Sequence, residues 1–208
     1  MAGEAKLAGA FVKRKIEGIL NSKNESATRA VLAKLRRGID KPPGSMPELW
    51  PITLDGLPDV LTGKTGGPTK GEWAVYTALT MFALHQQSKD MKGKPMHRDG
   101  ESLGVSVRRL AKEENAEARI KRRFDAVATA DSPEEIANHL RGLIQLLKSE
   151  DIPLDYAMLA EDLFVFQFPE GRDGVRLRWG RDFYRVNNKE IENQDAVREG
   201  KDEQDENE

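Results

Sequence analysis

The stretch that decides the fold is Trp73-Ala74-Val75-Tyr76-Thr77-Ala78-Leu79-Thr80-Met81-Phe82-Ala83-Leu84-His85-Gln86-Gln87-Ser88. Its apolar side chains recur at helical spacing and cover much of the circumference of a helix instead of one stripe. A helix of that kind is stable only when other helices surround it, because any side turned to water would leave apolar surface exposed. We therefore expect residues 73–88 to form the central helix of a bundle.

Two amphipathic helices are expected before this segment. The apolar stripe of the first consists of Leu7, Phe11, Ile16 and Ile19, and that of the second consists of Ala27, Val31 and Leu35. Gly38 is placed to end the second helix, since glycine adopts the left-handed conformation found just past many helices. Five prolines between residues 42 and 58 then predict an irregular segment over residues 40–60.

The helical pattern resumes after a polar break at residues 89–104. Ser132 as N-cap, Pro133 at the first helical position and Glu135 at the third predict a capping box before an apolar run. A further helix is predicted to open at Pro153, followed by a turn at residues 171–174. Residues 175–186 fit a short strand or a last helix, and we favour the helix.

The expected architecture is all-α, with two small helical bundles joined by a polar linker. Residues 1–90 form the predicted N-terminal bundle, and residues 100–186 form the predicted C-terminal bundle. Residues 187–208 form an acidic tail with hardly an apolar side chain. We expect this tail to be disordered, because it cannot bury enough surface to offset the entropy of ordering.

Composition excludes several classes of protein. The chain has no cysteine, which rules out disulfides and thiolate metal sites. It has neither a secretion-type leader nor an apolar run long enough to span a membrane, so a cytoplasmic location is expected. The three histidines, at positions 85, 97 and 139, lack metal-ligand spacing. We expect a protein that is not an enzyme and that has no cofactor.

The distribution of charge is more informative than its sum. The chain holds 33 Lys and Arg against 35 Asp and Glu, a formal net charge of -2. The last 22 residues contain nine of the acids and three of the bases, which leaves 30 basic and 26 acidic residues in residues 1–186. Basic residues gathered on helical faces indicate a surface that binds a polyanion, because local charge governs contacts to phosphate.

Three adjacent arginine pairs have no acidic neighbour in the sequence: Arg36-Arg37, Arg108-Arg109 and Arg122-Arg123. For any single arginine, an ordinary solvated helix surface is an equally good interpretation. Trp179 offers a ring for base stacking, but packing in the core is the better interpretation. The candidate nucleic-acid-binding residues are Arg29, Lys34, Arg36, Arg37, Arg108, Arg109, Arg119, Lys121, Arg122, Arg123, Arg141, Arg178 and Arg181.

Several segments together resemble one known family. They are Ala27 to Gly38, which includes Leu35-Arg36-Arg37, Ala83 to Gln87, Ser102-Leu103-Gly104, Arg122-Arg123-Phe124, and Arg178-Trp179-Gly180-Arg181-Asp182-Phe183-Tyr184. In their order and spacing these segments resemble the CasB family, the small subunit of the type I-E CRISPR surveillance complex, Cascade. The resemblance covers residues from about Phe11 to Arg185.

This resemblance implies an all-α, non-catalytic subunit that lines a basic path in the complex. Its implied partners are crRNA, the target and displaced DNA strands, the other Cascade subunits and a second copy of the chain. It implies backbone-contacting roles for Arg36, Arg37, Arg122, Arg123, Arg141 and the neighbourhood of Arg178 and Arg181. The alternative is a structural adaptor whose arginines contact acidic surfaces of neighbouring subunits. The acidic tail and the glycine-rich loop 62–71 inherit no role from the resemblance.

Overall fold

The structure is a computed structural model that describes residues 1–64, 66–111 and 114–185 of the chain, with the backbone alone for residues 114–116. The described residues are helical, apart from connecting segments and one isolated parallel bridge between His97 and Leu154. The predicted all-α fold is confirmed. The predicted disordered tail, residues 187–208, lies outside the described residues.

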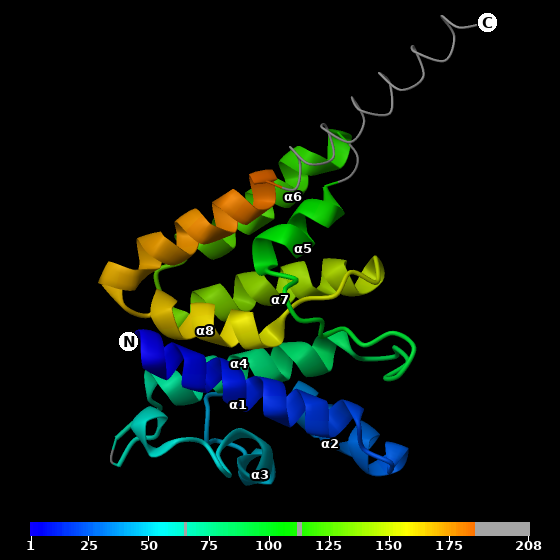
Figure 1. Ribbon diagram of the computed structural model, residues 1–208, viewed down its shortest axis with the longest axis vertical. Helices are drawn as coiled ribbons and strands as arrows, with labels where there is room; N and C mark the ends of the chain where they lie inside the picture. Colours follow the sequence, from blue (N-terminus) through cyan, green and yellow to red (C-terminus); the bar gives the residue numbers. More distant parts are fainter. Residues whose placement is uncertain (65, 112–113, 186–208) are drawn as a thin grey trace, which may run out of the picture.

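Helix α4 (Lys70–His85) is central, as the opening stretch predicts. Every residue from Ala74 to His85 is buried, and α4 packs against four long helices (Figure 1). These are α1 (Ala2–Leu20), α2 (Glu25–Arg37), α7 (Pro133–Ser149) and α8 (Tyr156–Phe166). A Thr69–Glu72 capping box starts α4, because each side chain accepts a hydrogen bond from the backbone N–H of the other residue, at 3.0 and 2.8 Å.

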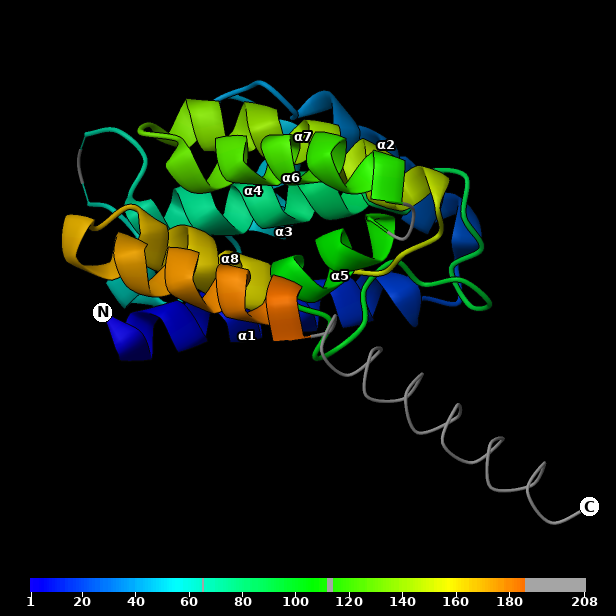
Figure 2. The same cartoon turned by 90° about the horizontal axis from the view of Figure 1, so that it is seen from above.

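The remaining elements form two outer layers around α4, α7 and α8 (Figures 1 and 2). On the side of α1 and α2 lie the short helices η1 (Pro47–Leu49), α3 (Trp50–Thr53) and η2 (Asp59–Leu61). They show that residues 40–60 are less irregular than their prolines predict. On the opposite side lie α5 (Leu103–Leu110), α6 (Glu114–Thr129) and a last helix that spans residues 169–185.

The buried faces of the first two helices differ from the predicted stripes. Phe11 and Ile16 are buried as expected, but Leu7 is 41% exposed. Helix α8 packs on the side of α1 that carries small residues, where an added Cβ at Gly9 would lie 2.6 Å from Glu161. In α2 the buried residues are Thr28, Leu32 and Leu35, so the true face is turned from the Ala27 and Val31 stripe. Small side chains permit close approach of helices, and a pattern of hydrophobic residues alone does not predict which face packs in this way.

Two helix ends also need correction. Gly38 caps α2 in a right-handed conformation, with φ of -76°. Its lack of a side chain is needed for space, because an added Cβ would lie 2.6 Å from the hydroxyl of Tyr76, which donates to the Gly38 carbonyl. Helix α8 starts at Tyr156 with Asp155 as N-cap, three residues later than the predicted start at Pro153. Pro153 belongs to the connection between α7 and α8, where the backbone of the next residue, Leu154, forms hydrogen bonds with Met96 and Arg98.

The last helix confirms one prediction and contradicts another. Residues 175–185 are helical, as favoured over a strand, but the helix already begins at residue 169, so the predicted turn at 171–174 is wrong. Trp179 is 1% exposed and stacks on Phe166 at a ring distance of 5.7 Å, which confirms its predicted place in the core. At the start of α7, the predicted N-cap Ser132 is confirmed. The carboxylate of Glu135 accepts a hydrogen bond from the backbone N–H of Asp131.

One continuous hydrophobic core runs from α1 to the last helix. It crosses the segment 89–104, where the sequence predicts the boundary between two bundles, because α8 packs on both α1 and α4. The division into residues 1–90 and 100–186 stays a prediction about folding units.

A polar contact lies inside this core. The Nδ1 atom of His85 lies 2.8 Å from the hydroxyl of Tyr156, and both side chains are fully buried between α4 and α8. Burial lowers the pKa of His85 to about 4, because the low-dielectric surroundings disfavour the imidazolium. His85 therefore stays neutral and joins two central helices.

This shift predicts a loss of stability in acid. Unfolded histidine titrates near 6.5, so the free energy of unfolding is fully present above that pH and falls as pH drops from 6.5 to 4. At about 1.4 kcal/mol per pH unit, the loss at pH 5 is roughly 2 kcal/mol. Asp162 acts in the opposite direction, since burial raises its pKa to about 6. Denaturant unfolding of the wild type and of His85→Gln at pH 7.5 and 5 isolates the histidine, because the variant lacks this component; equal losses would contradict the assignment.

The close packing of the last helix against α5 gives a second prediction. An added Cβ at Gly104 in α5 would lie 2.3 Å from the backbone oxygen of Trp179, so Gly104→Ala forces α5 and the last helix apart. We expect a loss of about 1–3 kcal/mol in the free energy of unfolding, as for other overpacked sites. Gly180→Ala is the matched control, because nothing lies within 4 Å of its added Cβ. That variant should be neutral or slightly stabilising.

Candidate nucleic-acid interface

The thirteen predicted cations lie on five helices. Four are on α2, two on α5, four on α6, one on α7 and two on the last helix: Arg29, Lys34, Arg36 and Arg37; Arg108 and Arg109; Arg119, Lys121, Arg122 and Arg123; Arg141; Arg178 and Arg181. The fold brings α6 and the last helix together, because Phe124 stacks on Phe183 with ring centres 5.6 Å apart. The basic residues of α2 lie on the other side of the central layer (Figure 1).

Several of these cations are neutralised by acids that lie outside their own helix. Arg37 pairs with Glu48 of η1 at 2.7 Å, and Arg109 pairs with Glu101 at 2.9 Å. Arg141 of α7 pairs with Asp40, which follows α2. Arg29 and Lys121 instead pair within their own helices, with Glu25 and Asp125. Lack of an acidic neighbour in sequence therefore does not mean lack of an acidic partner.

Arg178 has a structural partner. It forms an ion pair with Asp162 of α8, whose side chain is 5% exposed, and the Trp179 indole donates to the same carboxylate at 2.5 Å. Burial raises the pKa of Asp162 to about 6, while Arg178 and Trp179 act to lower it. The carboxylate ties the last helix to α8, and Arg178 balances its charge.

Arg108 is also held inside the fold. Its side chain is 11% exposed, lies 3.1 Å from Glu117 of α6, and stands 5.5 Å from the ring centre of Phe183. A guanidinium held by a carboxylate and an aromatic face has little surface left for phosphate.

A smaller set remains available to an external anion. Among the described residues, no ion pair or hydrogen bond engages the side chains of Lys34, Arg36, Arg119, Arg122, Arg123 and Arg181. All six lie on helix surfaces, and five of them are exposed, with Arg36 half-buried. Arg122-Arg123 is the only one of the three arginine pairs in which neither member has an acidic partner within the described residues.

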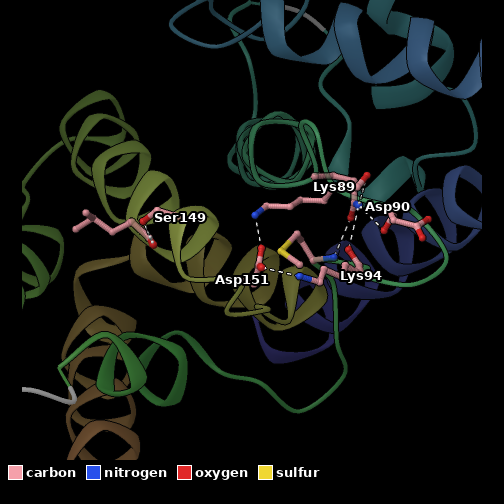
Figure 3. A network of polar contacts seen from close by, with 8 residues as sticks. Lys89, Asp90, Lys94, Ser149 and Asp151 are labelled. Atoms are coloured by element: carbon pink, nitrogen blue, oxygen red, sulfur yellow. Dashed lines mark hydrogen bonds and ion pairs between the residues drawn. The ribbon is translucent and has the colours of Figure 1, made fainter.

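The structure adds a group of lysines that the sequence analysis assigned to the linker. Lys89 and Lys94 both bind the carboxylate of Asp151, which joins the segment after α4 to the end of α7 (Figure 3). These two lysines lower the pKa of Asp151 to about 2. One carboxylate thus faces two cations, and positive charge remains in excess.

This excess borders a cleft of about 600 Å³ between α2 and residues 86–92. Four cations, Arg29, Arg36, Lys89 and Lys92, and two acids, Glu25 and Asp90, line the cleft. Lys148 lies close by, where its amine donates to Gln87 at 3.0 Å. Burial lowers the pKa of Lys148, and repulsion from Lys89 and Arg36 lowers it further. The cluster of Lys89, Lys92 and Lys148 had no signal in the sequence, because the fold alone brings these lysines beside Arg36.

One group of side chains has the composition of a metal site. Ligand atoms of His97, Asp99 and Asp155 lie within 4.8 Å of one another. However, Nδ1 of His97 accepts the Tyr156 N–H at 3.2 Å, so a neutral ring carries its proton on Nε2 and has no lone pair there for a metal. Asp155 accepts two backbone N–H groups as the cap of α8 and a third from Gly100, and Asp99 binds Lys13. These residues do not fit a metal ion.

Comparison with known proteins gives the family. The sequence family described as CRISPR-associated protein Cse2 matches residues 31–184. CasB from Thermobifida fusca is 33% identical with a TM-score of 0.71, and the match covers 85% of this chain and 97% of that one. CasB from Thermus thermophilus is 25% identical with a TM-score of 0.60, over 85% of this chain and 97% of that one. The chain therefore belongs to the Cse2 family, and the predicted resemblance is confirmed.

A more distant structure shares the fold. A chain of a solved "CRISPR RNA-guided surveillance complex" is 22% identical with a TM-score of 0.67, and the match covers 92% of this chain and 99% of that one. Among curated proteins, none gives a significant match. In the described residues, no helix is both long and apolar enough to cross a membrane.

An arginine that pairs with a buried acid and an arginine without an acidic partner in the described residues should respond differently to mutation. Arg178→Ala leaves the buried Asp162 without its cation, so we expect a loss of about 1–3 kcal/mol in the free energy of unfolding, discounted because Arg178 is 44% exposed. Arg181→Ala removes an exposed cation from the same helix and should change stability by less than about 0.5 kcal/mol. Chemical denaturation of both variants checks this. Unchanged stability of Arg178→Ala with weakened DNA binding would instead assign Arg178 to the interface.

Proposed function

We propose that this chain is a non-catalytic subunit of an RNA-guided CRISPR surveillance complex and binds nucleic-acid backbone there. The observation that carries the proposal is the set of surface cations without acidic partners in the described residues, centred on Arg36 of α2 and Arg122-Arg123 of α6. Membership of the Cse2 family supports it, and so does the shared fold with a chain of such a complex. Arginines that are not neutralised internally can each form charge-assisted hydrogen bonds to phosphate.

In such a complex, base pairing between guide RNA and target reads the sequence. A subunit beside the strands then needs only positive charge at fixed positions. Holding the displaced DNA strand stabilises the open R-loop, because the exchange of DNA duplex for RNA–DNA duplex is nearly balanced. The partners under this proposal are crRNA, the target and displaced DNA strands, the other Cascade subunits and a second copy of this chain.

A rigid helical frame suits this task. Arg119 and Arg122 are three residues apart on α6, and Arg123 lies toward Gly142 of α7, 3.6 Å from the position of an added Cβ. The Phe124 ring anchors α6 to the last helix, so these guanidinium groups project from a packed support. Cations on a fixed support lose less entropy when a phosphate binds than cations on a loose segment.

The adaptor alternative is favoured by a different observation. A cleft of about 520 Å³ opens between α4, α7 and the segment after α2, and Trp73, Tyr76, Met81 and several prolines line it. An apolar cleft of this kind accommodates a side chain of a protein neighbour better than a phosphate. Under this alternative the same arginines contact acids of other subunits.

A salt series separates the two functions. Each phosphate contact that is lost flattens the plot of log K against log salt by about 0.7 for single strands. Arg122→Ala/Arg123→Ala should therefore weaken binding of single-stranded DNA equally for all sequences and reduce the slope by roughly 1.4. Arg37→Ala should have a smaller effect than Arg36→Ala, because Arg37 is paired with Glu48.

Gel shifts with oligonucleotides of several sequences measure both quantities. Absence of any salt-dependent DNA binding, with intact assembly into a crRNA-loaded complex, would favour the adaptor. A changed sequence preference with an unchanged salt slope would show that Arg122 and Arg123 do not contact the backbone.

A further inference from the structure

The described chain ends beside its own cationic surface. The last helix runs along α6, where Arg176 donates to the Ala128 carbonyl at 2.5 Å and Phe183 stacks on Phe124. The pKa of Lys121 is raised by its ion pair with Asp125 and, to a smaller extent, by Tyr184, which places Tyr184 near Lys121. The last described residues, which end at Arg185, therefore lie beside α6.

The outer faces of these two helices form one surface, which we name the exit surface and define by Lys121, Arg122, Leu177, Arg181 and Tyr184. On the last helix, Val175, Trp179 and Phe183 face the core, so the spacing turns the other three members outward. Leu177 and Tyr184 are each 53% exposed, and Arg181 is exposed as well. Gly180 lies between them and α6, with open space at the position of an added Cβ.

This surface combines uncompensated positive charge with exposed apolar area. Lys121 pairs with Asp125, but Arg122 and Arg181 have no acidic partner in the described residues. Leu177 and Tyr184 are two of the few large apolar side chains that the described surface exposes. A suitable ligand is therefore an acidic segment that also carries an aliphatic side chain.

Residues 187–208 have that chemistry. They contain nine acids against Lys189, Arg198 and Lys201, and their aliphatic side chains larger than alanine are Ile191 and Val197. Ile191 comes six residues after Arg185, close to the start of the segment. The match to the family ends at residue 184, and 97% of Thermobifida CasB is matched by only 85% of this chain. The acidic segment thus lies outside the residues that the family model matches.

We propose that residues 187–208 bind the exit surface of their own chain and compete there with nucleic acid. The acids neutralise Arg122 and Arg181, and Ile191 covers Leu177 and Tyr184. The competing ligand rests on the proposed function, whereas the contact between the segment and the exit surface does not.

A weak contact is sufficient for this competition. A tethered ligand acts at an effective concentration of about 1 mM. If the free segment bound with a Kd of about 0.1–0.5 mM, tethering would reduce the affinity for DNA by roughly three- to elevenfold. Such a reduction discriminates against loosely bound polyanions, while a strand that the whole complex holds at several points displaces the segment. The effect weakens as salt rises, since it arises between solvent-exposed charges.

The first experiment measures binding of fluorescent oligodeoxythymidine by anisotropy at low salt. Three chains are compared: the full chain, the chain ending at residue 186, and a full chain whose nine tail acids are replaced by the matching amides. We expect the second and third chains to bind about three- to elevenfold more tightly than the first, with a ratio that shrinks as salt rises. Equal affinities for all three chains overturn the competition.

A substitution tests the place of the contact. Arg122→Glu/Arg181→Glu should abolish the difference between full and truncated chains, because the segment loses its partners. Arg36→Glu is the matched control on α2, and it should lower the affinity of both chains alike, so that their ratio stays the same. A ratio that depends on Arg36 and not on Arg122 and Arg181 overturns the exit surface as the site.

The second experiment needs no nucleic acid. A synthetic peptide of residues 187–208 is added to the ¹⁵N-labelled chain ending at residue 186, and amide shifts are followed by NMR. We expect shifts at Arg122, Leu177, Arg181 and Tyr184, and none around Arg36. Absence of shifts at the exit surface overturns the contact. If the full and truncated chains both fail to bind DNA, the competition falls with the proposed function, and the peptide shifts alone decide the contact.

Discussion

The arrangement of the whole molecule depends on the burial of α4. A helix whose residues from Ala74 to His85 all lie in the core needs neighbours on every side, and α1, α2, α7 and α8 supply them. Each neighbour then has one apolar face toward the centre and one polar face toward water. The candidate cations of α2 and α7 are confined to those outer faces, whereas those of α5, α6 and the last helix lie in the layer that packs outside α7 and α8.

The outer faces differ in how far their charge is compensated. Folding brings Glu48 to Arg37, Asp40 to Arg141 and Asp162 to Arg178. These pairs connect different elements of the fold, and their cations have less to offer an external phosphate. The candidate cations that stay without acidic partners in the described residues lie on α6, on the last helix and on α2 around Arg36. A surface that folding leaves positive favours any polyanion that can reach it, which links the packing of the helices to the proposed function.

Much of the fold was predictable, because it follows from local pattern. The opening stretch predicts a surrounded helix, Ser132 and Pro133 predict the start of α7, and Trp179 is a core residue as its size suggests. The errors come from information that one segment does not hold. The exposure of Leu7 depends on where α8 lies, and the need for glycine at position 38 comes from the Tyr76 hydroxyl, which would lie 2.6 Å from an added Cβ. Thr69 and Glu72 form a capping box whose pattern is present in the sequence, but the surrounding glycines are typical of a loop.

The candidate interface was less predictable than the fold, and for a physical reason. Helical spacing shows that a residue such as Arg178 or Arg122 lies on a polar face, but not which carboxylate lies across the gap. Arg178 lies opposite a buried aspartate, whereas Arg122 has no acidic partner in the described residues, and their sequence surroundings are equally basic. Whether a site keeps a net positive charge therefore depends on which two elements pack together there. For the same reason the lysines at 89, 92 and 148 join Arg36 only after α2, α4 and α7 have packed. In a helical protein of this kind, the residues to test first are therefore the cations whose nearest acids, after folding, are too few to neutralise them.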